Sequence, residues 1–469
     1  MHRSVRTTAL GAVVALVTTA CLGSDPEEGG DTTRNQDATE VSLTIAANAV
    51  AGGKNAEEAD WIENYVIPAF IEQQAEDGVE VTIEFQSSGV DDEEYKSRIA
   101  LDLRTGSGAD IVSIDGIWVG EFAEAGYIQP LTDVVGGDLV DEWEGWEQIN
   151  EAVQANMSFN DERYGVPAGS DGRVLFFNKA LFAQAGLPED WQPTSWEEVL
   201  EAGRALQALP GVTPIQLNAG TAMGEATTMQ GALPLLVGTG AEIYSEEKWQ
   251  GNTQNIRDVL GLYSEIYSSG LGDPTLQQEA QGRDKSFAEF AAGQIGILLE
   301  GDYFWRSVIE PTAGVAPMPT RDQDVGYAMV PAMEPGSGIN GQDFVSMSGG
   351  GGRVLNPATE FPQQAWELLA FMNSAEATKE LVGDGARLTQ REDVNEEILS
   401  NDPLLSFIAE EVVPLSAYRP GLAVYPEVSL ALQQATLDVV TGMSPEDAAA
   451  AYQAALEQVL GGADDIASD

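Results

Sequence analysis

Asp171 and Arg173, an acid and a base two residues apart, stand on a polar loop that is suited to contacting a polar molecule. The loop, residues 169–173, lies within the stretch RYGVPAGSDGRVLFFNKALFAQAGL at residues 163–187. A strand, a loop of this kind, then a second strand and a helix commonly form one wall of a binding cleft. The alternative is that the two side chains pair with each other at the surface, which contributes only ~0–1 kcal/mol.

Local signals predict the elements that position this loop. The β-rich run at residues 174–177 predicts a strand directly after it. Asn178 is a good N-cap for a helix that starts near Lys179, and Gly186 stands where a helix C-cap is expected.

Side chains for nucleophilic or metal-dependent catalysis are scarce. The one histidine is His2 and the one cysteine is Cys21, both in or beside an N-terminal leader. Ser-His and Cys-His catalysis and zinc sites with these ligands are therefore excluded from the mature chain. No EF-hand calcium loop is present. We expect no enzyme activity, no metal and no cofactor, although the many carboxylates leave a glycoside hydrolase acid pair open.

The charge balance narrows the possible partners. The sequence has 22 basic and 76 acidic residues and a net charge of −54. A surface this acidic repels nucleic acid and anionic lipid, so neither is an expected partner. The acids are spread along the chain, which is typical of a solvated surface that maintains solubility. We hypothesise a host that lives in high salt, where counterions screen the self-repulsion.

The N-terminus has the features of an export signal. His2, Arg3 and Arg6 form a short cationic region, and residues 9–17 form an apolar core that is too short to span a membrane. We predict a signal peptide over residues 1–20.

Cys21 follows that core and resembles the acylated cysteine of a bacterial lipobox, although Thr18 departs from the usual residue at its position. We therefore expect lipid attachment at Cys21, anchoring the protein to the outer face of the cell membrane through lipid only. The alternative is a secreted protein with an incidental cysteine. Residues 22–40 are rich in Gly, Asp, Glu and Thr, which predicts a disordered tether, and the lipidated tether as a whole spans residues 21–40.

The next part of the chain alternates between strand and helix patterns. Strands are expected at residues 41–47, 79–85 and 110–115, with helices between them. This alternation favours an α/β fold with a mainly parallel sheet, in which ligands bind beyond the carboxyl ends of the strands. That rule places Asn48 and the turn after Asp115 at the edge of a cleft.

Four consecutive glycines occur at residues 349–352, within a Gly- and Ser-rich passage. No phosphate-loop pattern accompanies them. We interpret the passage as a crossing between two domains, where flexible backbone, including Gly350, also approaches ligand.

Several stretches together resemble the family 1 extracellular solute-binding proteins, the maltose- and trehalose-type sugar receptors of ABC importers. The first is residues 163–187, followed by a Thr-Ser-Trp-Glu-Glu segment at residues 194–198. The others are SGADIVSIDGIWVGEFAEAGYIQPL at residues 107–131, FAAGQIGILLEGDYFW at residues 290–305, and an Arg-Pro ahead of a Tyr-Pro at residues 419–426.

The resemblance implies roles for five further residues. Asp115 and Trp118 match positions that contact sugar in the family, Tyr303 and Trp305 match aromatic residues that stack on it, and Arg419 matches an arginine that donates to its hydroxyls. Each has an alternative role: a helix N-cap for Asp115, core packing for the three aromatic residues, and an ordinary surface position for Arg419. Together with Asn48, Asp171, Arg173 and Gly350, these form the predicted ligand site.

The resemblance also implies the fold and the function. We expect a two-lobed periplasmic-binding-protein-like fold with a hinge, each lobe a mainly parallel sheet flanked by helices. The expected bounds are 41–155 with 352–398 for the N-terminal lobe, 156–351 with 399–461 for the C-terminal lobe, and 462–469 for a tail. A monomer would capture a disaccharide or oligosaccharide and deliver it to an ABC transporter permease. The alternatives are a receptor for a polyol or glycerol phosphate, a carbohydrate-active hydrolase, and a sensor module that does not transport.

Overall fold

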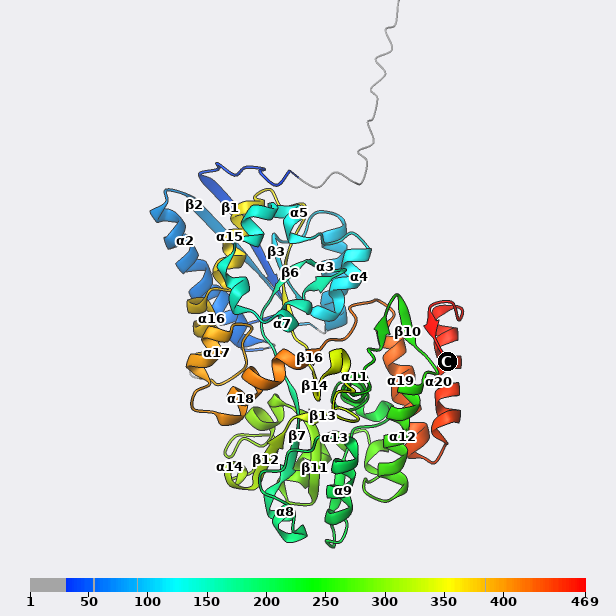
Figure 1. The fold of residues 1–469 in the computed structure, drawn as a ribbon. Helices are drawn as coiled ribbons and strands as arrows, with labels where there is room; N and C mark the ends of the chain where they lie inside the picture. Colours follow the sequence, from blue (N-terminus) through cyan, green and yellow to red (C-terminus); the bar gives the residue numbers. More distant parts are fainter. Residues whose placement is uncertain (1–30, 54, 91, 384) are drawn as a thin grey trace, which may run out of the picture.

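Two lobes, one above the other in Figure 1, are each built on a β-sheet with helices packed around it. The protein is represented by a computed structural model that describes residues 31–53, 55–90, 92–383 and 385–469. The predicted signal peptide, Cys21 and the first part of the predicted tether, residues 22–30, lie outside the described residues.

Lobe 1 contains a five-stranded sheet in the order β2-β1-β3-β15-β6. These strands are Glu80–Ser87, Glu40–Ala47, Ile111–Asp115, Gly351–Leu355 and Gly165–Pro167. β1 is parallel to both its neighbours because helices cross over between β1, β2 and β3, whereas β15 enters from the other lobe and runs antiparallel. The helices of this lobe include α1 (Ala56–Trp61), α2 (Ile67–Glu76), α3 (Asp92–Arg104), α15 (Pro362–Met372) and α16 (Ala375–Val382).

Lobe 2 contains a four-stranded sheet in the order β12-β7-β11-β8. These strands are Val325–Ala328, Arg173–Asn178, Ile295–Gly301 and Thr213–Gln216. β7 and β11 are buried along their whole length, which explains their near-continuous apolar sequences. The surrounding helices include α8 (Lys179–Ala185), α9 (Trp196–Leu206), α12 (Gln254–Ser268), α13 (Gly282–Ala291), α19 (Tyr425–Val440) and α20 (Pro445–Leu460).

The two caps predicted for α8 are confirmed. Asn178 accepts a hydrogen bond from the backbone N–H of Leu181 over 3.0 Å. Gly186 ends the helix with a φ of 76°, a left-handed conformation that favours glycine.

Three segments connect the lobes. Residues 168–172 join β6 to β7, and residues 348–350 join β14 (Phe344–Met347) to β15. The third, residues 399–402, joins α17 (Glu392–Ile398) to α18 (Pro403–Phe407). A small sheet of β13 (Val330–Pro331), β14 and β16 (Ser416–Ala417) lies where these segments enter lobe 2 (Figure 1).

Residues 31–39 are docked on lobe 1, so the prediction of a disordered tether up to residue 40 is wrong for them. Nη1 of Arg34 donates to the carbonyl of Thr359 over 3.1 Å, and Nδ2 of Asn35 donates to the carbonyl of Glu360 over 2.8 Å. The side chain of Gln364 bonds back to the carbonyl of Asn35 over 3.1 Å. These hydrogen bonds from side chains to backbone carbonyls, together with the packing of Ala38 against the core, order a polar segment, and composition cannot predict them.

The C-terminal residues 462–469, expected to be only a tail, include a short strand. β17 (Ile466–Ala467) pairs in parallel with β10 (Lys248–Gln250), and Asp469 forms a 2.7 Å ion pair with Arg257. Across the part of the chain that the structure describes, no helix is both long enough and apolar enough to cross a bilayer.

Candidate functional site

A cavity of about 700 Å³ lies between the lobes and is bordered by two of the connecting segments. Its walls come from the carboxyl ends of β1 and β3, from the segment after β11, and from the glycines before β15. Five of the predicted site residues line it: Asn48, Asp115, Trp118, Asp171 and Gly350. The other four do not: Arg173, Tyr303, Trp305 and Arg419.

Asn48 follows β1 and presents an unused acceptor. Its Nδ2 donates to the carbonyl of Val90 and to Oδ1 of Asp92, each over 3.0 Å. Its Oδ1 is buried and has no hydrogen-bond partner among the residues that the structure describes. A buried acceptor without a partner is costly, so a ligand hydroxyl that donated to it would be favoured.

Asp115 ends β3 and serves locally as a cap. Its carboxylate accepts from the backbone N–H of Ile117 over 3.1 Å, at the start of a 3₁₀ turn. Burial raises the pKa of Asp115, and the positive charge of Arg419 partly reverses the increase. The N-cap alternative for this residue is therefore present, and it leaves the second carboxylate oxygen for a ligand.

Trp118 belongs both to the cavity lining and to the packing of lobe 1. Only 7% of its surface is exposed, and its ring lies 6.4 Å from that of Tyr95 and 6.3 Å from that of Phe122. Lys96 places its ammonium 5.9 Å from the ring centroid. The indole is therefore held rigidly, and only an edge of it is available to a ligand.

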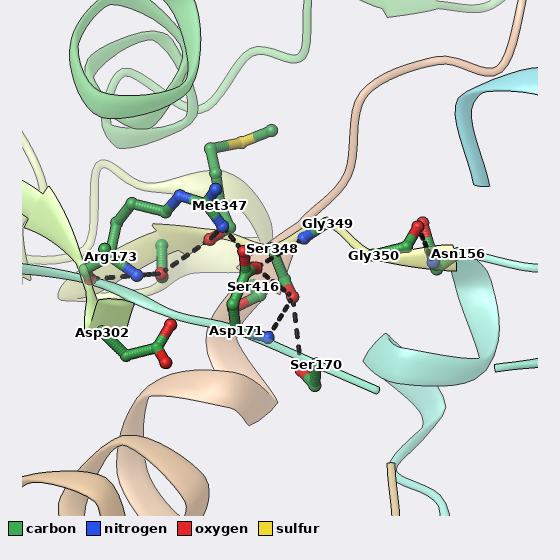
Figure 2. Close-up of polar contacts among 12 residues, drawn as sticks. Asn156, Ser170, Asp171, Arg173, Asp302, Met347, Ser348, Gly349, Gly350 and Ser416 are labelled. Atoms are coloured by element: carbon green, nitrogen blue, oxygen red, sulfur yellow. Dashed lines mark hydrogen bonds and ion pairs between the residues drawn. The ribbon is translucent and has the colours of Figure 1, made fainter. Parts of the chain in front are cut away.

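Asp171 accepts hydrogen bonds from the neighbouring connecting segment, residues 348–350 (Figure 2). Its Oδ1 accepts from the backbone N–H of Gly349 over 2.7 Å and from the hydroxyl of Ser348 over 3.1 Å. It also forms a short ion pair with Arg173. Arg173 is only 5% exposed and donates to the carbonyl of Met347 over 3.1 Å, so the acid and the base do pair, but inside the protein.

Gly350 has a backbone conformation that suits glycine, with a φ of 119°. Its carbonyl accepts from the side chain of Asn156 over 2.9 Å and from the backbone N–H of Gly116 over 3.1 Å. The glycine therefore ties the crossing segment to lobe 1, on the opposite side from the Asp171 contacts (Figure 2).

Arg419 lies close to Asp171, because a Cβ on Gly349 would be within 4 Å of both side chains. Its side chain is 15% exposed and its Nη1 lies 3.3 Å from a carboxylate oxygen of Glu225. Its Nε is buried without a partner. The structure therefore brings Arg419 to the connection between the lobes, next to the cavity, rather than to an outer surface.

Tyr303 and Trp305 lie apart from the cavity lining. The hydroxyl of Tyr303 donates to the buried Glu300, and Arg283 covers its ring at 5.2 Å. Trp305 is 6% exposed, with Arg321 at 3.9 Å from its ring. Its indole N–H donates to Asp402 over 3.1 Å. Core packing, the alternative role of these aromatics, describes Trp305 well.

Sequence reasoning missed seven charged residues of the cavity. They are Glu57, Glu58, Asp92, Asp302, Arg306, Arg353 and Arg387. Asp302 is 1% exposed; burial and the negative charge of Asp171 raise its pKa, and its Oδ1 has no partner. The available signal was the position of Asp302 directly after the buried strand β11, where ligand contacts are common. The arginines come from distant segments and had no shared signal. Among the described residues, no cluster of three or more metal-ligating side chains occurs.

Comparison with known proteins agrees with this architecture. A family model described as bacterial extracellular solute-binding protein matches residues 55–379. A binding protein of Brucella abortus (strain 2308) is 22% identical over 354 residues, which cover 75% of this chain and 79% of that protein.

Solved structures share the fold at low sequence identity. The sugar-binding protein MalE of Xanthomonas citri is 17% identical with a TM-score of 0.71, over 90% of this chain and 97% of that chain. The cyclic α-maltosyl-1,6-maltose binding protein of Arthrobacter globiformis is 22% identical with a TM-score of 0.69, over 90% and 99%. The family match covers more than half of the sequence, and the chain therefore belongs to the bacterial extracellular solute-binding proteins, which bind their solutes and are not enzymes.

Proposed function

We propose that this protein captures a disaccharide or oligosaccharide between its lobes and delivers it to the permease of an ABC importer. The observation that carries the proposal is the interlobe cavity, in which an indole edge, several carboxylates including Asp115 and Asp171, and an unused amide oxygen face one space. Sugars combine hydroxyls with C–H surfaces, so polar groups and aromatic rings together suit them. Proteins of similar fold are described as binding maltose and related sugars.

Binding would be coupled to closure of the lobes. Asp115 and Trp118 belong to lobe 1, Asp302 belongs to lobe 2, and Asp171 belongs to a segment that crosses between them. A ligand that contacts both lobes favours the closed arrangement by its additional contacts there, and so shifts an existing equilibrium. The permease would then recognise the closed form.

The N-terminal leader is the basis for a proposed location of the protein in the cell. We infer an extracytoplasmic monomer that is attached to the outer face of the membrane through a lipid on Cys21. Residues 31–39 pack on lobe 1, which supports an arrangement in which the chain leads from the lipid anchor directly to this lobe. Mass spectrometry of the membrane fraction tests the lipid, and light scattering of the soluble domain tests the monomer.

A ligand panel tests the proposed function. Thermal shift and calorimetry would compare mono-, di- and oligosaccharides, polyols and glycerol 3-phosphate, and a bound sugar should raise the melting temperature. Asp115→Asn and Trp118→Leu should weaken sugar binding at least tenfold. Glu457→Ala, which removes an exposed carboxylate on α20, should not. Tight binding of a polyol or phosphate alone, or hydrolysis of the sugar, would contradict the proposal.

A further inference from the structure

Two arginines from opposite lobes face the same space between the lobes. Arg306 lies after β11 in lobe 2, and Arg387 lies after α16 in lobe 1. Both line the interlobe cavity, and both also line a neighbouring cavity of about 790 Å³. They therefore stand at the junction of the two spaces, where a ligand that extended from one into the other would pass them.

Neither guanidinium is saturated by its neighbours within the described residues. The carboxylate nearest to Arg387 is that of Glu57, at 3.8 Å and with 84% of its side chain exposed. Its other contact is a long hydrogen bond of 3.4 Å to the carbonyl of Leu381. Arg306 uses its Nε for Asp302 over 2.9 Å, which leaves its terminal nitrogen atoms with only a 3.4 Å contact to Ser307.

The two positive charges act on each other. Burial lowers the pKa of Arg387. The charges of Glu57 and Glu58 oppose this decrease, and those of Arg306 and Arg353 add to it. Like charges brought together across a gap disfavour closure of that gap unless a counter-charge enters it. Within the described part of the chain, three of the 22 basic residues of the sequence line this cavity, beside six acidic residues.

Asp302 and Glu57, which also line this cavity, each contact one of the two arginines. Three other acidic residues of the cavity are engaged elsewhere. Glu58 accepts from Arg353 over 2.8 Å, and Asp171 is held by Gly349 and Arg173. Asp92 accepts from Asn48 over 3.0 Å. These three carboxylates bond other groups, and their negative charge makes the surroundings unfavourable for a doubly charged phosphate.

We propose that the ligand is an acidic sugar, with a carboxylate that binds between Arg306 and Arg387 and so joins the two lobes. The proposal rests on the proposed function as a sugar receptor and names the substrate class. Two guanidinium forks match the two oxygens of one carboxylate. The hydroxyls of the remaining sugar would face the polar groups of the interlobe cavity.

Pairs of sugars that differ in one or two carboxyl groups test this directly. Calorimetry would compare cellobiouronic acid with cellobiose and digalacturonic acid with galactobiose, and inorganic phosphate and glucose 6-phosphate would be included. At least one acidic sugar should bind tenfold or more tightly than its neutral partner. Arg387→Gln and Arg306→Gln should remove most of that preference, and Arg387→Lys should retain part of it.

Arg204→Gln is the matched control, because it removes the same charge from the exposed surface of α9 and should leave the preference intact. Circular dichroism of Arg387→Gln and Arg387→Lys would show that a changed preference does not come from unfolding. Equal or tighter binding of the neutral sugars would overturn the inference of an acidic ligand, but the proposed function as a sugar receptor would remain supported. A preference that survived both glutamine variants, or tighter binding of the phosphates, would also overturn it. Binding of none of the sugars would overturn the proposed function itself.

Discussion

The backbone N–H of Gly349 donates to Oδ1 of Asp171 over 2.7 Å, and this contact joins two of the three segments that connect the lobes. Asp171 belongs to the connection before β7, and Gly349 belongs to the connection before β15. The same carboxylate lines the interlobe cavity. Because the Asp171 carboxylate belongs to both the connection and the cavity, it can couple ligand binding to the relative arrangement of the two lobes.

Replacement of Asp171 tests this relationship. Asp171→Ala should lower the free energy of unfolding by about 1–3 kcal/mol, since hydrogen bonds to a charged group are lost and Arg173 loses its counter-charge. It should also weaken sugar binding more than tenfold. Urea unfolding and calorimetry measure the two effects, with Glu457→Ala as the control for loss of a charge. Unchanged values of both would mean that the carboxylate has no such role.

Gly350 gives a second test of the connection. Gly350→Ala would force a side chain into a backbone conformation with a φ of 119°, at a cost of about 1–3 kcal/mol. Gly336→Ala is a suitable control because that loop glycine also has a positive φ, of 78°, and no atom within 4 Å of the added Cβ. Small-angle scattering should show a changed lobe arrangement for Gly350→Ala only. A similar change in both variants would mean that Gly350 has no special role in the arrangement of the lobes.

Trp305 is expected to act on stability rather than on ligand affinity. Trp305→Phe removes the indole N–H that bonds Asp402, a residue that also caps α18. We expect a lower melting temperature and an affinity within a factor of two of the original. A drop in affinity without a loss of stability would instead place Trp305 at the ligand, as the family resemblance implied.

Buried carboxylates predict the direction of the pH dependence. Burial raises the pKa values of Asp115, Glu300 and Asp302. As pH rises from the ordinary pKa towards the raised one, the unfolded chain loses its protons first. Stability therefore falls with rising pH across that window and stays lower above it. Melting temperatures measured upward from about pH 4, the ordinary pKa of a carboxyl group, test this. Asp302→Asn should flatten the curve, and a rise in stability with pH would contradict the argument.

Salt should stabilise the folded chain. With a net charge of −54, self-repulsion opposes compaction, and raising the salt from about 0.1 M to about 1 M shortens the screening length from ~10 Å to ~3 Å. We expect the melting temperature to rise steadily with sodium chloride. A flat response would count against the hypothesis of a high-salt host.

The sequence by itself determined the local elements and their order. Hydrophobic runs form the buried strands β7 and β11. Asn178 caps the start of α8 and Gly186 caps its end, as expected. These features depend on side chains a few residues apart, so local physical rules are sufficient to predict them. The motif order was likewise sufficient to identify the family.

Only the tertiary structure decided which charged groups meet. Arg306 and Arg387 are far apart in the chain, and they share a cavity because β11 and α16 end at the same interlobe space. The neighbours of Trp305 were decided in the same way, since Arg321 and Asp402 come from later segments. Such contacts depend on how the lobes pack rather than on local spacing, so a pattern of residue types along the sequence does not predict them.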